Sequence, residues 1–198
     1  MTTAVKPAKP PTRREQILDA ALALFADSGS RGTSVAAVAE RVGITDAGVL
    51  YHFKTKQELL LGVLARFEQK VDERVVESGA RGIELLRMVR DWGKVMERVP
   101  DISALWILLT AEHLTTPSPA RERIQRRYDR LVARYVTAFA TASRQGDLLA
   151  DLDPVHEASA LVAHLDGIRL QWFLLDRSFS MADSVRAYVD ATLERLAP

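Results

Sequence analysis

Residues 33–61 read TSVAAVAERVGITDAGVLYHFKTKQELLL, and their spacing predicts two short helices followed by a longer one. Thr33 or Ser34 can cap the first helix, which Gly43 ends because glycine readily adopts the left-handed C-terminal position. Thr45 can cap the second helix almost at once. Two short amphipathic helices joined by a tight turn containing glycine predict a helix-turn-helix.

The flanking sequence predicts a helix on each side of this motif. Upstream, apolar residues recur at helical spacing from Thr12 to Ser28-Gly29. Downstream, Thr55 and Glu58 form a capping-box pattern that opens a long helix. Residues 1–11 contain three prolines and no apolar periodicity, so we expect a flexible arm.

The C-terminal half contains further helix-start patterns and no strand pattern. Asp101, Ser118-Pro119 and Asp153-Pro154 are typical of helix starts. The predicted helices are 59–78, 82–98, 102–114, 119–145, 154–176 and 181–196. The sequence therefore predicts an all-α protein of about nine helices, with an arm at 1–11, a helix-turn-helix domain at 12–58 and a larger helical domain at 59–198.

Composition narrows the functional classes. The chain has no cysteine, which excludes a disulfide framework, a thiolate metal site and a cysteine nucleophile. No apolar stretch approaches the roughly 18 to 20 residues that cross a bilayer, so we expect a cytoplasmic protein without membrane contact. The net charge is +1, but residues 1–57 hold eight Lys or Arg against five Asp or Glu, leaving 19 against 21 elsewhere. The positive excess lies within the first 57 residues.

The motif resembles the DNA-binding segment of the TetR family of bacterial repressors. The resemblance rests on the capping Thr-Ser, the Ala-Val-Ala-Glu helix, the Gly-Ile-Thr turn, Tyr-His-Phe-Lys, and Lys-Gln-Glu-Leu-Leu. It covers residues 13–65 and implies a dimeric repressor that binds a palindromic operator and is released by a small-molecule effector, without a cofactor. Many members have tyrosine where this chain has Leu50, so either Tyr51 supplies that phosphate contact or no residue does.

The second helix of such a motif enters the major groove with its N-terminal residues. We therefore expect base contacts from Asp46, Ala47, Gly48 and Val49. The expected phosphate contacts come from Thr33, Thr45, Tyr51, His52, Lys54 and Lys56, and the resemblance adds weight to Thr33, Thr45, His52 and Lys56. Alternatively, Thr33 and Thr45 are only helix caps and Tyr51 only packs on the first helix.

The resemblance also implies a homodimer and an effector cavity in the larger domain. The apolar stripes expected at the dimer interface comprise Ala158, Leu161, Val162, Leu165, Ile168, Trp172, Val185, Tyr188, Val189 and Leu193, although either stripe could instead face the subunit's own core. An amphipathic effector would suit the side chains of Trp92, Met96, Trp106, Leu109, His113, Tyr128, His164 and Gln171. Each of these could equally be a core residue.

Three other interpretations remain open. Glu112-His113 and His164-x-Asp166 could be offered as metal ligands of an enzyme, but their spacing matches no known metal helix, so we expect no enzyme. An activating, architectural or protein-recruiting role without a small-molecule ligand is the main alternative. Basic residues near the N-terminus could also reach a minor groove; these are Lys6, Lys9, Arg13 and Arg14.

Overall fold

The computed structural model describes residues 10–198, except for the side chains of residues 67, 68 and 70–76. The described part is all-α and contains no strand, as the sequence predicted. Most of the predicted arm, with Lys6 and Lys9, lies outside the described residues. In chain order the elements are α1 (Arg13–Gly32), α2 (Val35–Val42), α3 (Asp46–His52), α4 (Lys56–Ser78), α5 (Gly82–Met88), the 3-10 helix η1 (Val89–Asp91), α6 (Trp92–Glu97), α7 (Pro100–His113), α8 (Pro119–Gln145), α9 (Pro154–Leu174) and α10 (Met181–Arg195).

Helix α1 begins at a capping box and bends at a glycine. The Thr12 hydroxyl accepts from the Glu15 N–H, and the Glu15 carboxylate accepts from the Thr12 N–H at 2.7 Å. Gly29 breaks the helix because its φ of 69° is left-handed, and one further turn runs to Gly32. The predicted end at Ser28-Gly29 therefore marks the kink but omits the last turn.

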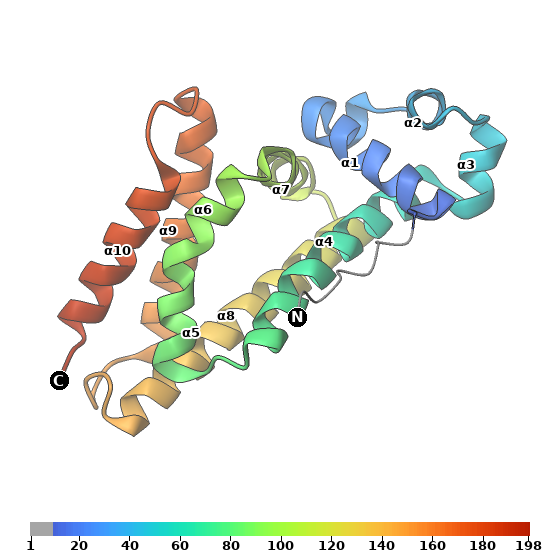
Figure 1. The fold of residues 1–198 in the computed structure, drawn as a ribbon. Helices are drawn as coiled ribbons and strands as arrows, with labels where there is room; N and C mark the ends of the chain where they lie inside the picture. The colour runs from blue at the N-terminus through green and yellow to red at the C-terminus, as the bar shows by residue number, and fades with distance from the viewer. Residues whose placement is uncertain (1–9) are drawn as a thin grey trace, which may run out of the picture.

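Short-range caps define α2 and α3. Of the two predicted caps of α2, Ser34 is the one observed, with its hydroxyl accepting from the Ala37 N–H at 3.0 Å. Gly43 ends α2 with a φ of 73°. The Thr45 hydroxyl accepts from the Gly48 N–H at 3.2 Å, which opens α3 at the predicted place. These caps hold α3 at the outer edge of the three-helix group (Figure 1).

Helix α4 begins at Lys56, after a capping pair close to the one predicted. The Thr55 hydroxyl accepts from the Glu58 N–H at 3.0 Å, while the Glu58 carboxylate accepts from the Lys54 N–H at 2.9 Å. The carboxylate thus reaches one residue beyond the N-cap. The helix leaves the three-helix group and runs toward the rest of the chain (Figure 1).

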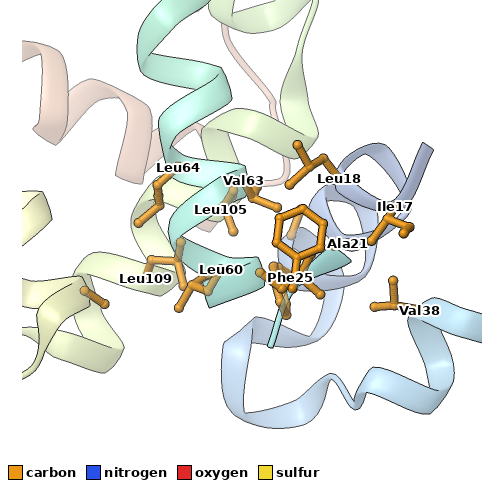
Figure 2. Packing of buried hydrophobic residues seen from close by; sticks show 14 of the residues in the cluster. Ile17, Leu18, Ala21, Phe25, Val38, Leu60, Val63, Leu64, Leu105 and Leu109 are labelled. Atoms are coloured by element: carbon orange, nitrogen blue, oxygen red, sulfur yellow. The ribbon is translucent and has the colours of Figure 1, made fainter. Parts of the chain in front are cut away.

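The core of the N-terminal helices extends into the second half of the chain. Figure 2 shows side chains of α1, α2, α4 and α7 meeting in one cluster. Leu60 and Leu64 of α4 and Leu105 and Leu109 of α7 are all buried there, beyond the predicted domain boundary after residue 58. Apolar packing therefore crosses that boundary, and the division into two domains stays a prediction.

A second core joins α5, η1, α6, α8, α9 and α10. Helices α9 and α10 lie at the end of the molecule opposite α2 and α3 (Figure 1). A Cβ on Gly93 would lie 2.6 Å from the Met181 carbonyl oxygen, so glycine permits the close approach of α6 to α10. No helix in the described residues is both long and apolar enough to cross a bilayer.

Several predicted boundaries differ from the structure. The helix predicted over 82–98 is divided by η1 into α5 and α6. When these are counted as one helix, the described residues contain the predicted number of nine helices. Asp101 does not cap α7, because Val99 takes the N-cap position and Pro100 the first helical position. The predicted starts of α8 and α9 are confirmed, since Ser118 and Asp153 accept from the first-turn amides.

Candidate nucleic-acid interface and cavities

The outward face of α3 carries small and polar side chains. Thr45, Asp46 and Ala47 are exposed at its first turn, and Gly48 is half-buried. Small side chains at this place allow the backbone to approach base edges, and the free amides of the helix N-terminus favour a phosphate. The structure thus brings four predicted positions together on one solvent-facing turn.

The C-terminal end of α3 adds an aromatic and basic group. The Tyr51 side chain is 76% exposed. The Lys54 ammonium lies 5.7 Å from the centre of the Tyr51 ring, and the His52 ring meets it edge-on at 5.3 Å. Lys56 is half-buried on the next helix. Because Tyr51 faces solvent, the alternative in which it only packs on α1 is wrong.

Two predicted contact residues are turned into the protein. Val49 is 1% exposed and packs in the first core, so it cannot reach a thymine methyl group. Thr33 is also buried, and its hydroxyl donates to the carbonyl oxygens of Gly29 at 2.9 Å and Leu24 at 3.1 Å. The predicted side-chain contacts of Val49 and Thr33 are therefore wrong, because Val49 packs in the core and the Thr33 hydroxyl binds carbonyl oxygens of α1.

Leu50 belongs to the exposed face although the sequence analysis gave it no contact. Its side chain is 39% exposed. It lies three residues after Ala47 and four after Asp46, which is the spacing of one helix face. That spacing was a usable signal. Arg14 also lies close to this region, with its guanidinium 4.8 Å from the centre of the Phe53 ring.

Helix α7 holds the C-terminal end of α1 through one carboxylate. Glu112 accepts from the Ser30 N–H at 3.0 Å, from the Ser30 hydroxyl and from the Arg31 N–H at 3.3 Å. Gly29 leaves room for this contact, since a Cβ there would overlap a Glu112 carboxylate oxygen. The last turn of α1 is thus tied to a helix of the C-terminal half.

A cavity of about 350 Å³ lies beside the same end of α7. Two of its lining residues have a buried polar atom without a hydrogen-bond partner, the Thr110 hydroxyl and the His113 Nε2, while the His113 Nδ1 lies 3.2 Å from the Ser118 hydroxyl. We name it the α7–α8 cavity, and its lining comprises Thr110, His113, Leu114, Arg121, Ile124, Gln125 and Tyr128. It contains two of the residues predicted to bind an effector, His113 and Tyr128.

A second cavity of about 260 Å³ lies between α5–α6, α8 and α9, and we name it the α8–α9 cavity. Trp92 and Met96, both predicted effector residues, line it. The Tyr128 hydroxyl, from the wall of the first cavity, donates to Asp166, in the wall of the second, at 2.7 Å. Burial and the neighbouring Asp166 charge raise the pKa of Tyr128 to about 12, so its hydroxyl stays protonated at neutral pH.

The other four predicted effector residues lie elsewhere. Trp106 and Leu109 are fully buried in the first core against α1 and α4, and they line neither of these two cavities. Gln171 is exposed to solvent. His164 stacks on Tyr188 with ring centres 3.8 Å apart, and it lines neither cavity.

Most side chains of the apolar stripes predicted for a dimer interface face the subunit's own core. In the second core, the buried members are Ala158, Leu161, Val162, Leu165, Trp172, Val185 and Val189, and the partly buried members are Ile168, Tyr188 and Leu193. A side chain already enclosed within one subunit offers little apolar surface to a partner. The seven buried side chains therefore serve the subunit's own core, while a dimer contact of the partly buried Ile168, Tyr188 and Leu193 stays a prediction.

Two of the residues considered as metal ligands, Glu112 and Asp166, already have hydrogen-bond partners within the protein. Glu112 binds the end of α1, and the Asp166 carboxylate accepts from Arg169 at 2.5 Å as well as from Tyr128. Across the described residues, no three His, Asp or Glu side chains come together as a metal site.

Comparison with known sequences agrees with the helix-turn-helix and extends beyond it. Residues 17–63 match the family described as bacterial regulatory proteins, tetR family, and residues 84–198 match the BetI-type transcriptional repressor, C-terminal family. The HTH-type transcriptional regulator TtgR of Pseudomonas putida is 31% identical over 194 residues, covering 93% of this chain and 92% of TtgR.

Solved structures share the arrangement of both halves. A transcriptional regulator from Saccharomonospora viridis, in complex with choline, superposes with a TM-score of 0.77 at 25% identity, covering 91% of this chain and 95% of that one. FadR from Bacillus subtilis, in complex with stearoyl-CoA, superposes with a TM-score of 0.76 at 18% identity, covering 90% and 95%. The fold is therefore common to this chain and to ligand-bound regulators.

Proposed function

The chain belongs to the TetR family of bacterial regulatory proteins and is a DNA-binding transcriptional regulator, and on that premise we propose that it is a repressor released by a small molecule. It acts as a homodimer on a palindromic operator, in the cytoplasm where that DNA lies. The S. viridis regulator in complex with choline supports a small-molecule effector. The relatives are named as regulators, which supports DNA binding without catalysis.

One observation carries the release step: the same end of α7 lines a cavity and holds the DNA-binding helices. Thr110 and His113 line the α7–α8 cavity, and each has a buried polar atom without a partner. Glu112, between them, binds the backbone of Ser30 and Arg31. A ligand that moves this turn moves the end of α1 with it. Binding energy that differs between two positions of α7 then shifts the orientation of α3.

The proposed DNA contacts follow the exposed face of α3. Asp46, Ala47, Gly48 and Leu50 face the base edges, while Thr45, Tyr51, His52, Lys54 and Lys56 contact phosphates. The exposure of Tyr51 beside Lys54 supports Tyr51 as the phosphate-contacting tyrosine. The N-terminus of α3 adds partial positive charge to this surface.

The proposed dimer uses the solvent-facing side of α9, opposite the predicted stripe. Ser159, Ala163 and Gly167 recur every four residues and give this side a shallow profile. Leu170 and Leu174, which are 42% and 70% exposed, continue it. A twofold axis along such a surface brings two α9 helices close together, and two recognition helices can then reach half-sites about 34–36 Å apart.

A substitution on α3 tests DNA binding. An operator is first isolated by selection from a random duplex pool, and its affinity is measured by fluorescence anisotropy. Ala47→Glu places a carboxylate against the phosphates, so we expect an affinity loss of more than about tenfold. Ala133→Glu, on an exposed position of α8, is the matched control and keeps full affinity. If the wild-type protein enriches no palindrome, or Ala47→Glu binds unchanged, the proposed DNA contact is wrong.

A substitution on α9 tests the dimer. A Cβ on Gly167 meets nothing within 4 Å in the subunit, so Gly167→Arg leaves the fold intact but blocks the partner. We expect a monomer in sedimentation velocity and loss of operator binding, while Ala133→Arg remains dimeric. A Gly167→Arg variant that stays dimeric would move the interface away from this side of α9.

A further inference from the structure

The α8–α9 cavity has an apolar wall and one charged side. Its apolar lining comprises Leu85, Met88, Val89, Val95, Met96, Leu131, Val162 and Leu165. Its volume of about 260 Å³ equals about nine water molecules in the liquid, at ~30 Å³ each. Such a space suits a compact molecule with a hydrophobic body.

On the charged side of the cavity, the Asp166 carboxylate has more of its hydrogen bonds satisfied than the Arg169 guanidinium. Asp166 is satisfied twice, by the Tyr128 hydroxyl at 2.7 Å and by the Arg169 Nη2 at 2.5 Å. Arg169 is 6% exposed, yet its Nε has no hydrogen-bond partner. A buried donor without an acceptor is unfavourable, particularly on a charged group. The charged side of the cavity therefore has a cationic donor without an acceptor and has no acceptor without a donor on Asp166.

Arg127 and Arg134 also line the cavity, but each already has a partner, so Arg169 is the cation with an unpaired donor in this lining. The ring of Trp92, which would otherwise receive a cationic head group, already lies 5.8 Å from the Arg169 guanidinium.

Tyr135 adds a neutral polar group to this lining. Burial raises the pKa of Tyr135 to about 12, so this residue brings no negative charge at neutral pH. An anion can therefore accept a hydrogen bond from the Arg169 Nε, whereas a cation would be repelled by the same guanidinium.

We propose that the α8–α9 cavity binds a small organic carboxylate, whose apolar body fills the cavity and whose carboxylate accepts hydrogen bonds from Arg169. The planar guanidinium presents donors that match a carboxylate in geometry and charge. This inference rests on the proposed function: it assigns the effector to a chemical class and to the α8–α9 cavity, which the Tyr128–Asp166 hydrogen bond connects to the α7–α8 cavity at the end of α7. It distinguishes this chain from the relative that binds choline, a cation.

Paired probes test the charge of the ligand. Octanoate and 2-naphthoate are titrated into the full-length dimer by isothermal calorimetry, each against its own amide, with choline as the cationic probe. We expect each carboxylate to bind at least about tenfold more tightly than its amide, because charge-assisted hydrogen bonds are stronger than neutral ones. Equal binding of acid and amide, tighter binding of choline, or no binding of either acid overturns the proposal.

Variants test the place of binding. Arg169→Lys keeps the charge but removes the Nε donor, and we expect octanoate affinity to fall by about tenfold. Met88→Trp fills the cavity from a partly exposed position and abolishes octanoate binding even if Arg169→Lys fails to fold. His113→Phe, in the α7–α8 cavity, is the control and binds octanoate as the wild type does. Loss of binding in His113→Phe together with normal binding in Met88→Trp would place the ligand in the other cavity and overturn the proposal.

The calorimetry contains no DNA, so failure of this inference can be separated from failure of the proposed function. If no carboxylate binds but operator binding by the dimer is intact, the ligand class is wrong and the regulator remains. If octanoate binds through Arg169 but leaves operator affinity unchanged, the ligand class is confirmed and the release mechanism is wrong.

Discussion

The helix-turn-helix and the C-terminal bundle both contain helix caps between residues close in sequence, but the bundle also contains ion pairs between residues far apart. In the former, the caps Thr12–Glu15, Ser34–Ala37 and Thr45–Gly48 close between residues three apart. In the latter, Arg195 binds both oxygens of the buried Glu157 across 38 positions, and Arg90 binds Asp190 across 100. Caps between neighbouring residues define the helices of the helix-turn-helix, whereas the bundle also depends on contacts that form only when distant parts of the chain pack together.

This difference explains why the two halves suit different tasks. A locally capped helix keeps its shape when its neighbours shift, so α3 can change orientation as a rigid element. A bundle whose polar groups are paired over long distances responds when one partner is displaced. The two halves meet at α7, which contributes Leu105 and Leu109 to the first core and holds α1 through Glu112.

The largest expected effect tests whether the two halves share one core. Trp106 of α7 is 1% exposed within the cluster of α1 and α4. Trp106→Ala leaves a large cavity there, and we expect the free energy of unfolding to fall by about 3–5 kcal/mol, with operator binding lost as well. Urea denaturation followed by circular dichroism measures this change. The control Leu114→Ala, at a 63% exposed position, changes stability by less than ~0.5 kcal/mol. Full operator binding by a destabilised Trp106→Ala would show that the halves are independent.

The contact between the halves gives the next largest effect. Glu112→Ala leaves the Ser30 and Arg31 donors without their acceptor, so we expect a loss of about 1–3 kcal/mol in the free energy of unfolding. Operator affinity then becomes less sensitive to effector, because α7 no longer holds α1. Glu122→Ala breaks only an exposed ion pair with Arg126 and serves as the control. A Glu112→Ala protein with unchanged stability and full effector response would remove this contact from the mechanism.

A cap of the helix-turn-helix should have a smaller and local effect. Ser34→Ala removes the acceptor for the Ala37 N–H and lowers stability by about 1 kcal/mol. We expect weaker operator binding and unchanged octanoate affinity, measured side by side. Thr116→Ala, in the exposed segment between α7 and α8, is neutral in both measurements. A change in octanoate affinity in Ser34→Ala would contradict the local character of the cap.

The smallest expected effect is a pH dependence in the bundle. Burial lowers the pKa of His164 below its ordinary value of 6.5, and its ring stacks on Tyr188. The unfolded chain therefore binds a proton more readily, so this residue's contribution to stability is present above pH 6.5 and is lost as the pH falls through the folded-state pKa. We expect urea midpoints to decrease between pH 7.5 and pH 5.5, with a shallower decrease in His164→Phe. His156→Phe, on an exposed residue, is the control, and an equal slope in all three proteins would contradict this role.

The parts of the site that could be predicted share a short-range origin. Thr45, Gly43 and the Thr55–Glu58 pair act within a few residues, so their spacing was sufficient evidence. Leu50 and Val49 show the limit of this approach: spacing places Leu50 on the face of Asp46 and Ala47 and Val49 on another, but it does not say which of the two faces is buried.

The sequence by itself determined the helical class, the helix-turn-helix, most helix starts and the sign of charge near the motif, because caps and apolar periodicity act between neighbouring residues. Only the tertiary structure decided which apolar stripe became core, how Glu112 meets α1 and why Arg169 has an unmatched donor. Those features depend on side chains up to 82 positions apart, and packing alone brings such distant groups into contact.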